Sequence, residues 1–219
     1  MHRTEIDGLR AIAVLSVILN HIDRTILPNG HLGVDIFFVI SGFVITQSTV
    51  SRQYKSFRHY LLGFYQRRIK RLVPALFLCI AVTSVFVLLV ISPDSSFASS
   101  SLRTGVAALF GVSNLFLLKQ TNDYFSSSAE LNSFTHTWSL GVEEQFYVLF
   151  PQILWCSGLP QDRTGAVKKF SFIIGATAIA SFVSYIWLSK INPIAAFYLM
   201  PTRFWELAFG AGVYLSLIH

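Results

Sequence analysis

An arginine and a histidine lie eleven residues apart in the first apolar stretch of the chain, Asp7 to Leu27. At about 100° per residue, eleven helical steps return to within roughly 20° of the starting direction, so Arg10 and His21 project from one face. At about 1.5 Å per residue they lie roughly 16 Å apart along the axis. An imidazole can act as a general base near neutral pH. His21 is therefore a candidate base, and an interfacial histidine at a helix end is the alternative.

Carboxylates in later apolar stretches are the candidate partners of His21. Asp35 lies at the start of the second stretch, where it could orient His21 or complement the helix dipole. Glu143 and Glu144 are adjacent in another stretch, and neighbouring helical positions point about 100° apart, so at most one faces a given pocket squarely. Ionisable groups inside membrane helices are costly and usually face an interior cavity. We therefore take His21 and Asp35 as catalytic candidates, together with one of the pair Glu143 and Glu144.

Two further pairs of polar residues lie close to the ends of apolar stretches. Arg203 and Glu206 are three residues apart on a predicted helix, so they could pair with each other or belong to the site. His136 and Trp138 precede another stretch, and an interfacial tryptophan is an ordinary membrane anchor.

Basic residues are concentrated between Arg52 and Arg71, which contains seven Lys or Arg and no acid. This excess predicts a cytoplasmic loop, and the N-terminus is then also cytoplasmic. Arg10 would lie near the inner surface and His21 near the outer one. Arg68 and Arg71 either anchor the chain and contact anionic lipid, or clamp the phosphates of a nucleotide-containing donor.

The hydrophobic pattern predicts an all-α polytopic membrane protein. The chain has 219 residues, of which 53% are hydrophobic and 13% charged, whereas soluble domains carry about 25% charged residues. Six or seven transmembrane helices are expected over residues 7–27, 32–49, 72–91, 102–118, 138–156, 170–188 and 198–218. Residues 92–101 are expected to form a polar loop and 189–197 a connector. The short stretch 102–118 either spans the membrane or is re-entrant or a surface helix.

Several functional classes are not favoured by the sequence. The net charge of +6 is explained by basic membrane-flanking segments, so no nucleic acid partner is expected. No glycine-rich phosphate loop, HExxH or paired CxxC motif occurs, and no metal site is predicted. Cys79 and Cys156 lie within apolar runs and indicate no disulfide framework. No cleavable signal peptide is recognised.

Five pieces of the chain together resemble the integral-membrane acyltransferase-3 family, the O-acetyltransferases of bacterial cell-envelope glycans. They are EIDGLRAIAVLSVILNH, GVDIFFVISGFVIT, FYQRRIKRLVPAL, FTHTWSLGVEEQFYVLFP and MPTRFWELAFGAG, in this order. The residues that match family motifs are Arg10 and His21 (Arg-x10-His), Arg68 and Arg71 (Arg-x-x-Arg), Ser41 and Gly42, Trp138 and Glu143, and Arg203 and Glu206.

The resemblance implies transfer of an acetyl group from cytoplasmic acetyl-CoA to a glycan hydroxyl outside the inner membrane, on lipopolysaccharide O-antigen, peptidoglycan or a similar acceptor. Family members have about ten spans, so residues 1–219 are expected to be an acyltransferase transmembrane domain that is incomplete at its C-terminus. The HTWSL and R-x-WEL blocks are similar to the subgroup fused to an SGNH-hydrolase-like domain. A transporter or permease-like protein and an inactive truncated scaffold are the alternatives.

The resemblance also assigns roles to the candidate residues. Arg10, Arg68 and Arg71 would hold the phosphates of acetyl-CoA, with no metal required. His21, supported by Asp35 or Glu143, would take the proton of the glycan hydroxyl or relay the acetyl group outward. Substrate binding or structural support is expected from Ser41, Gly42, His136, Trp138, Arg203 and Glu206.

Overall fold

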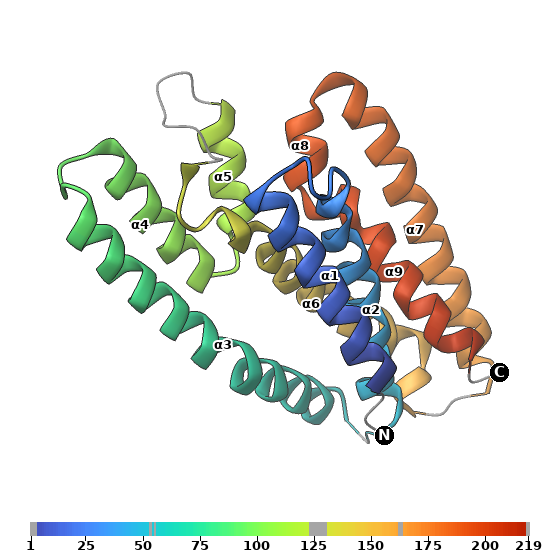
Figure 1. Cartoon of the computed structure of the whole chain (residues 1–219). Helices are drawn as coiled ribbons and strands as arrows, with labels where there is room; N and C mark the ends of the chain where they lie inside the picture. Colours follow the sequence, from blue (N-terminus) through green and yellow to red (C-terminus); the bar gives the residue numbers. More distant parts are fainter. Residues whose placement is uncertain (1–3, 53, 55, 123–130, 162–163, 218–219) are drawn as a thin grey trace. The chain divides into compact units, whose positions relative to one another are not determined.

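The computed structural model describes residues 4–217, apart from residues 53, 55, 123–130 and 162–163. Every regular element in these residues is helical, which confirms the all-α prediction (Figure 1). The elements are α1 (Thr4–Ile22), η1 (Gly30–Leu32), α2 (Gly33–Val50), α3 (Phe57–Val90), α4 (Ser96–Leu109), α5 (Ser113–Asn122), η3 (Thr135–Thr137), α6 (Trp138–Ser157), η4 (Leu159–Gln161), α7 (Ala166–Ile191), α8 (Pro193–Tyr198) and α9 (Met200–Ser216).

Within the described part of the chain, three helical segments are long and apolar enough to cross a membrane: Gly30–Val50, which joins η1 to α2, Phe57–Val90 and Ala166–Ile191. In α3 and in α7, only 11% of the most apolar 18-residue window is buried. Apolar helices of this length that face outward are suited to lipid and not to water. These helices are those of a membrane protein.

From Phe57 onward the basic stretch is helical, contrary to the predicted loop. Helix α3 begins at Phe57, and the Ser56 hydroxyl caps it by accepting the backbone N–H of His59 at 3.3 Å. Tyr60 and Phe64, one turn apart, are almost completely buried. These two rings form an apolar stripe on the basic stretch, and this stripe is buried in the protein. Counting the charges of the stretch does not reveal the stripe.

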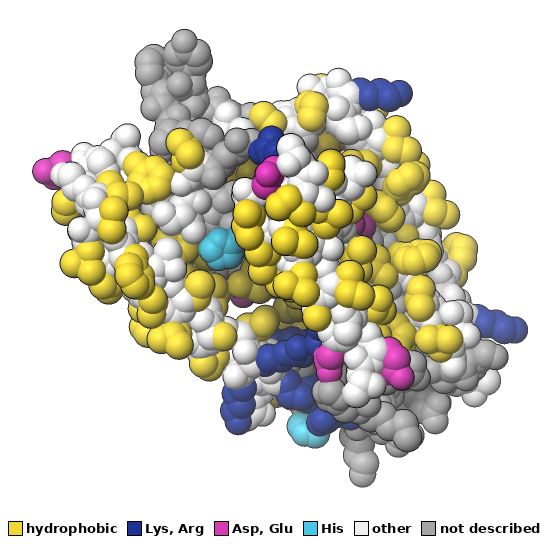
Figure 2. Space-filling view, in the orientation of Figure 1, with side chains coloured by type: hydrophobic (Ala, Val, Ile, Leu, Met, Phe, Trp, Pro, Cys, Tyr) yellow, Lys and Arg dark blue, Asp and Glu magenta, His cyan; other side chains and the backbone are white. Residues whose placement is uncertain are grey.

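Helix α3 is longer than a membrane span needs to be. Its 34 residues extend about 51 Å, against a hydrocarbon thickness of about 30 Å. Lys and Arg side chains gather where the helix begins, and hydrophobic side chains cover the remainder (Figure 2). Pro74 lies near the middle of the helix, where its missing N–H removes one intrahelical hydrogen bond.

The stretch 102–118 is not one helix. Helix α4 begins within the predicted loop 92–101, because the Ser95 hydroxyl caps it by accepting the backbone N–H of Ala98 at 3.1 Å. It ends at Leu109, and α5 begins at Ser113 after Gly111, whose φ is +68°. This left-handed conformation favours glycine and breaks the helix. The predicted connector 189–197 likewise contains a short helix, α8, capped by Asn192.

The chain forms two compact units, and the first comprises Met1–Gln53, Gln152–Val183 and Arg203–His219. Here α2 lies directly against α1. A Cβ added to Gly33 would be 2.3 Å from the carbonyl oxygen of Ala13, and one added to Gly30 would be 2.2 Å from that of Ser16. Gly33 follows Gly30 in the chain, but it faces Ala13, which precedes Ser16. The two helices α1 and α2 therefore run antiparallel.

The second unit comprises Tyr54–Pro151 and Ser184–Thr202, and a buried amide network holds its broken helix. The Asn114 side chain donates to the backbone carbonyl of Tyr198 at 2.9 Å. The Gln145 side chain donates to the Asn114 side-chain carbonyl at 2.8 Å and to the backbone carbonyl of Gly111 at 3.1 Å. These bonds join the α4–α5 turn to α6 and α8, and they satisfy backbone groups that a continuous helix would have paired.

Candidate functional site

His21 is exposed in the last turn of α1, in the first unit. Its ring Nδ1 lies 2.8 Å from the carbonyl oxygen of Val17, one turn earlier. A carbonyl oxygen only accepts hydrogen bonds, so Nδ1 carries the proton and donates. In the neutral ring the lone pair is then on Nε2, which points the basic nitrogen of His21 away from its own helix backbone.

The structure does not bring Asp35 to His21. The contacts of Gly30 with Ser16 and of Gly33 with Ala13 fix the register of α2 on α1. Continuing that antiparallel register, Asp35 lies at a level of α1 close to Arg10, which is about ten residues, or roughly 15 Å, from the level of His21. Arg10 itself lies 3.7 Å from the carboxylate of Asp7.

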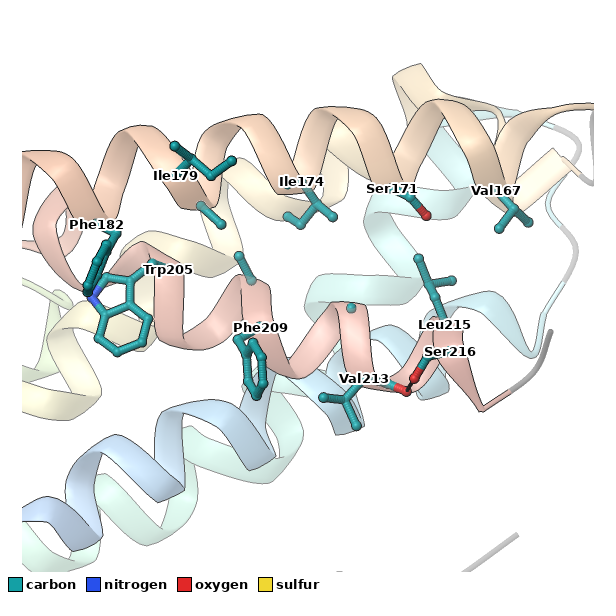
Figure 3. A pocket seen from close by; sticks show the side chains of 14 residues that line it. Val167, Ser171, Ile174, Ile179, Phe182, Trp205, Phe209, Val213, Leu215 and Ser216 are labelled. Atoms are coloured by element: carbon teal, nitrogen blue, oxygen red, sulfur yellow. Dashed lines mark hydrogen bonds between the residues drawn. The ribbon is translucent and has the colours of Figure 1, made fainter.

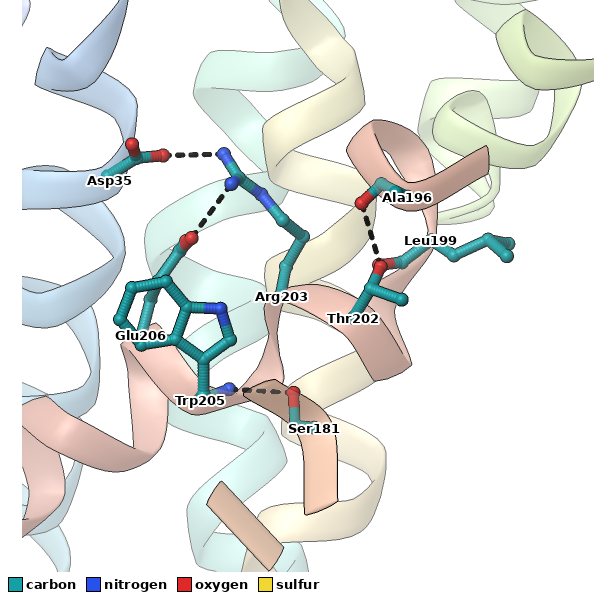
Figure 4. Close-up of polar contacts among 8 residues, drawn as sticks. All are labelled: Asp35, Ser181, Ala196, Leu199, Thr202, Arg203, Trp205 and Glu206. Atoms are coloured by element: carbon teal, nitrogen blue, oxygen red, sulfur yellow. Dashed lines mark hydrogen bonds and ion pairs between the residues drawn. The ribbon is translucent and has the colours of Figure 1, made fainter. Parts of the chain in front are cut away.

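The partner of Asp35 is Arg203 of α9, which donates from Nη2 to the Asp35 carboxylate (Figure 4). The other terminal nitrogen of Arg203 lies 2.8 Å from a carboxylate oxygen of Glu206. Arg203 is 5% exposed and Glu206 is 1% exposed, and the guanidinium also lies over the Phe38 ring. The pairing of Arg203 with Glu206, one of the two alternatives from the sequence, is confirmed, and the partly exposed Asp35 completes a triad of two carboxyl groups and one guanidinium.

Ser41 and Gly42 lie one to two turns further along α2, where α2 meets α9. Ser41 is buried, and a Cβ on Gly42 would be 1.9 Å from the backbone carbonyl oxygen of Leu207. The contact is reciprocal, because a Cβ on Gly210 would be 1.9 Å from the carbonyl oxygen of Val39. Gly42 therefore allows two helix backbones to touch beside the charged triad.

An apolar groove of about 760 Å³ lies between α7 and α9 in the first unit (Figure 3). Its polar side chains are Ser171, Ser216 and Trp205, and none of the described residues that line it is ionisable. The Ser216 hydroxyl donates to the backbone of its own helix, at Val213. The described lining of the groove therefore offers shape and apolar surface, and it includes no acid, base or activated nucleophile.

In the second unit, α3 and α6 place Arg68, Tyr147 and Glu143 together. The guanidinium of Arg68 lies over the Tyr147 ring, 5.5 Å from its centroid, and the Tyr147 hydroxyl donates to a carboxylate oxygen of Glu143 at 2.9 Å. Glu143 is 4% exposed. The Tyr65 hydroxyl adds a bond from α3 to the backbone carbonyl of Tyr147 at 3.2 Å. Arg68 thus has a fixed aromatic support, and its side chain lines a cavity of about 450 Å³.

The remaining predicted residues have different surroundings. Arg71 is exposed on α3, three residues beyond Arg68. His136 is exposed in η3. Trp138 is 6% exposed, and its ring lies 4.3 Å from that of Phe197 and 5.8 Å from that of Tyr198, centroid to centroid. Trp138 is therefore a packing residue of the second unit and not an exposed anchor.

The cavity beside Arg68 also contains residues that the sequence interpretation did not select. Glu144 and Gln145 line it, together with Gly111 of the α4–α5 turn. Tyr147 was detectable, since it lies one helical turn after Glu143, where side chains meet. The approach of Gly111 to α6 had no sequence signal beyond the glycine itself.

Both units belong to a helical membrane protein with an oriented imidazole on one unit and a cation-lined cavity in the other. The chain matches the acyltransferase-3 family, described as an acyltransferase domain, over residues 3–218, and it belongs to this family.

Curated relatives agree with this assignment. O-acetyltransferase OatA of Staphylococcus aureus strain NCTC 8325 / PS 47 is 43% identical over 149 residues, which are 68% of this chain and 24% of the relative. A protein of S. aureus strain COL with the name "Putative O-acetyltransferase SACOL0978" is 36% identical over 187 residues, which are 85% of this chain and 30% of the relative. The chain thus spans less than a third of the length of these relatives. No solved structure matches it.

Proposed function

We propose that the protein transfers an acetyl group from acetyl-CoA to a hydroxyl of a cell-envelope glycan, such as peptidoglycan or lipopolysaccharide O-antigen. The observation that carries the proposal is the orientation of His21 in a member of an acyltransferase family. Because Nδ1 donates to the Val17 carbonyl, Nε2 is the nitrogen available to accept a proton. Two relatives whose names describe O-acetyltransferases support the reaction class.

The reaction follows from the chemistry of these groups. His21 Nε2 takes the proton of the glycan hydroxyl, and the oxygen attacks the acetyl carbonyl. The new C–O bond forms while the C–S bond to coenzyme A breaks, and the imidazolium returns its proton to the leaving thiolate. Donor phosphates are held by Arg68 and Arg71, and Arg10 is proposed to contribute to the same task. No metal ion takes part.

The supporting roles follow from the contacts of each residue. Glu143 fixes Tyr147, and through this ring it fixes the support of Arg68. Asp35 acts through Arg203 and Glu206, which brace α2 against α9, instead of through a direct bond to His21. Ser41, Gly42, His136 and Trp138 shape their respective units.

The membrane arrangement is part of the proposal. We propose six or seven spans in the inner membrane, with the N-terminus in the cytoplasm. The gathering of cations where α3 begins supports this orientation, since Lys and Arg favour the cytoplasmic side. Within this arrangement α4 and α5 form a broken, re-entrant pair, which the amide network of Asn114 and Gln145 makes compatible with burial.

The test is replacement of His21 in cells that lack the native enzyme. His21→Ala should abolish O-acetylation of surface glycan, measured by mass analysis, and leave the protein inserted at the wild-type level. His31→Ala is the matched control, because His31 is another exposed histidine of the same unit, in η1. Full acetylation by His21→Ala would refute the proposal, and so would equal losses in both variants.

A further inference from the structure

The cavity beside Arg68 in the second unit lies along α3. It is lined on one side by five α3 residues at helical spacing, which cover two turns or about 12 Å. The opposite sides come from α6 and from the α4–α5 turn. The lining residues along α3 are Tyr65, Arg68, Ile69, Leu72 and Val73. A cation therefore lies near one end of a groove whose far end is aliphatic.

Most polar groups of this cavity are engaged by neighbouring groups. The Tyr65 and Tyr147 hydroxyls donate to the backbone of α6 and to Glu143, respectively, and the Gln145 amide donates to the turn and to the network beside it. Glu144 differs from them, because no residue among those described forms a hydrogen bond or ion pair with its carboxylate. Its side chain is half-buried and lines the cavity.

The carboxylate of Glu144 lies directly against the α4–α5 turn. A Cβ on Gly111 would be 2.3 Å from a carboxylate oxygen of Glu144 and 3.1 Å from its Cβ. Gly111 has a positive φ, and its carbonyl is fixed by Gln145, the residue next to Glu144. Because Gly111 has no side chain, the Glu144 carboxylate can occupy the space at the cavity wall where the Cβ of another residue would lie.

A ligand that satisfies this cavity needs three features. An anionic group would pair with Arg68, N–H or O–H donors would reach Glu144, and an apolar, slender part would lie between the aliphatic walls. A phosphate-ended arm that carries amide groups combines all three. Flat aromatic bases fit less well, since Phe110 is the one ring besides the two engaged tyrosines among the described lining residues.

We propose that Glu144 is a binding residue for the amide-bearing arm of the acyl donor. The inference rests on the proposed function, whose donor is acetyl-CoA, and it adds the part of the donor that this cavity recognises. Glu144 accepts hydrogen bonds from the arm and so fixes how far the thioester extends past Arg68. The carboxylate takes no part in bond making, so its loss should affect donor binding more than the chemical step.

The experiment measures ligand affinity by titration calorimetry on the whole chain in lipid nanodiscs. The probes are coenzyme A, 4′-phosphopantetheine and adenosine 3′,5′-bisphosphate. Glu144→Ala should weaken the first two by about 10- to 100-fold and leave the third unchanged, because one charge-assisted hydrogen bond is lost. Glu144→Gln keeps an acceptor and nearly the same shape, so its loss should be only about three- to tenfold. Glu5→Ala, which removes an exposed carboxylate of α1, is the matched control.

The outcomes separate this inference from the proposed function. If the wild-type protein binds coenzyme A and Glu144→Gln and Glu144→Ala bind all three probes normally, the inference is wrong and the donor proposal stands. An equal loss for adenosine 3′,5′-bisphosphate would also overturn it. Failure of the wild-type protein to bind coenzyme A would overturn the donor and, with it, the arm subsite. In acetylation assays, Glu144→Gln should raise KM for the donor and leave kcat within about twofold.

Discussion

Replacement of Arg203 by methionine should strongly destabilise the first unit. The guanidinium lies between two carboxylates, and its removal leaves Asp35 and Glu206 facing each other with no cation among the residues that the structure places at this cluster. Removing one partner of a buried ion pair typically costs about 3–5 kcal/mol. Arg203 is 5% exposed and Glu206 is 1% exposed, so the full value is expected for this site.

The two carboxylates should contribute unequally to that cost. The side chain of Asp35 is 30% exposed, whereas that of Glu206 is 1% exposed. Water can therefore solvate Asp35 after Arg203 is lost, but it cannot reach Glu206. Neutralising Glu206 in the double variant Arg203→Met/Glu206→Gln should recover most of the lost stability. The double variant Arg203→Met/Asp35→Asn should recover much less.

Thermal unfolding in detergent, followed by tryptophan fluorescence, measures these differences. For a chain of this size, about 3–5 kcal/mol corresponds to a fall in Tm of roughly 6–20 °C. A change of less than about 1 kcal/mol for Arg203→Met would refute the reasoning, because it would show that the triad contributes no more than an exposed pair. Greater rescue by Asp35→Asn than by Glu206→Gln would refute the assignment of the cost to burial.

Three further predictions concern single positions, each measured as a change in the midpoint of thermal unfolding. Gly42→Ala should lower the stability of the fold by at least about 2 kcal/mol, because the added Cβ would overlap the backbone of α9. Gly212→Ala, with open space around it, should be neutral or stabilising. Equal effects of the two substitutions would contradict the close helix contact. Gly111→Ala should cost more than Gly165→Ala, since both have positive φ but only Gly111 has a neighbour within 4 Å of the added Cβ; a smaller cost at Gly111 would be evidence against that contact. Tyr147→Phe should cost about 1.5–3 kcal/mol through loss of its bond to a carboxylate, and an unchanged midpoint would remove this bond from the argument.

Local sequence patterns predicted the helices and the local ion pair, and they failed where distant residues decide. Arg203 and Glu206 are three residues apart, so helical spacing was enough to suggest their pairing, which the structure confirms. Asp35 is 168 residues from Arg203, and no periodicity connects them. His21 is much closer to Asp35 in the sequence, and a contact between them was therefore the predicted one. That contact required α2 to pack on α1 in a register that Gly30 and Gly33 do not allow.

Two features of the secondary structure were not predicted from the sequence, and the reason is the same for both. The basic stretch was predicted as a loop because its charge was counted, but burial of Tyr60 and Phe64 outweighs the exposed cations and extends α3 by more than three turns. The stretch 102–118 reads as a continuous apolar run, yet Asn114 and Gln145 satisfy a break at Gly111 that apolar content cannot reveal. In both cases, tertiary packing overrode the local preference.

The bond between Asp35 and Arg203 also sets an order of events during synthesis of the chain. At a translation rate of about 5–20 residues per second, the 168 residues between them take roughly 10–30 s to be made. During this interval α2 exists with its acidic residue but without the cation that will neutralise it. Helix α9 emerges last among the described helices and carries Arg203 and Glu206 together, three residues apart, so it arrives already paired internally. The arrival of α9 is therefore the step that supplies the hydrogen-bond partner of Asp35, the last long-range contact of α2 to form.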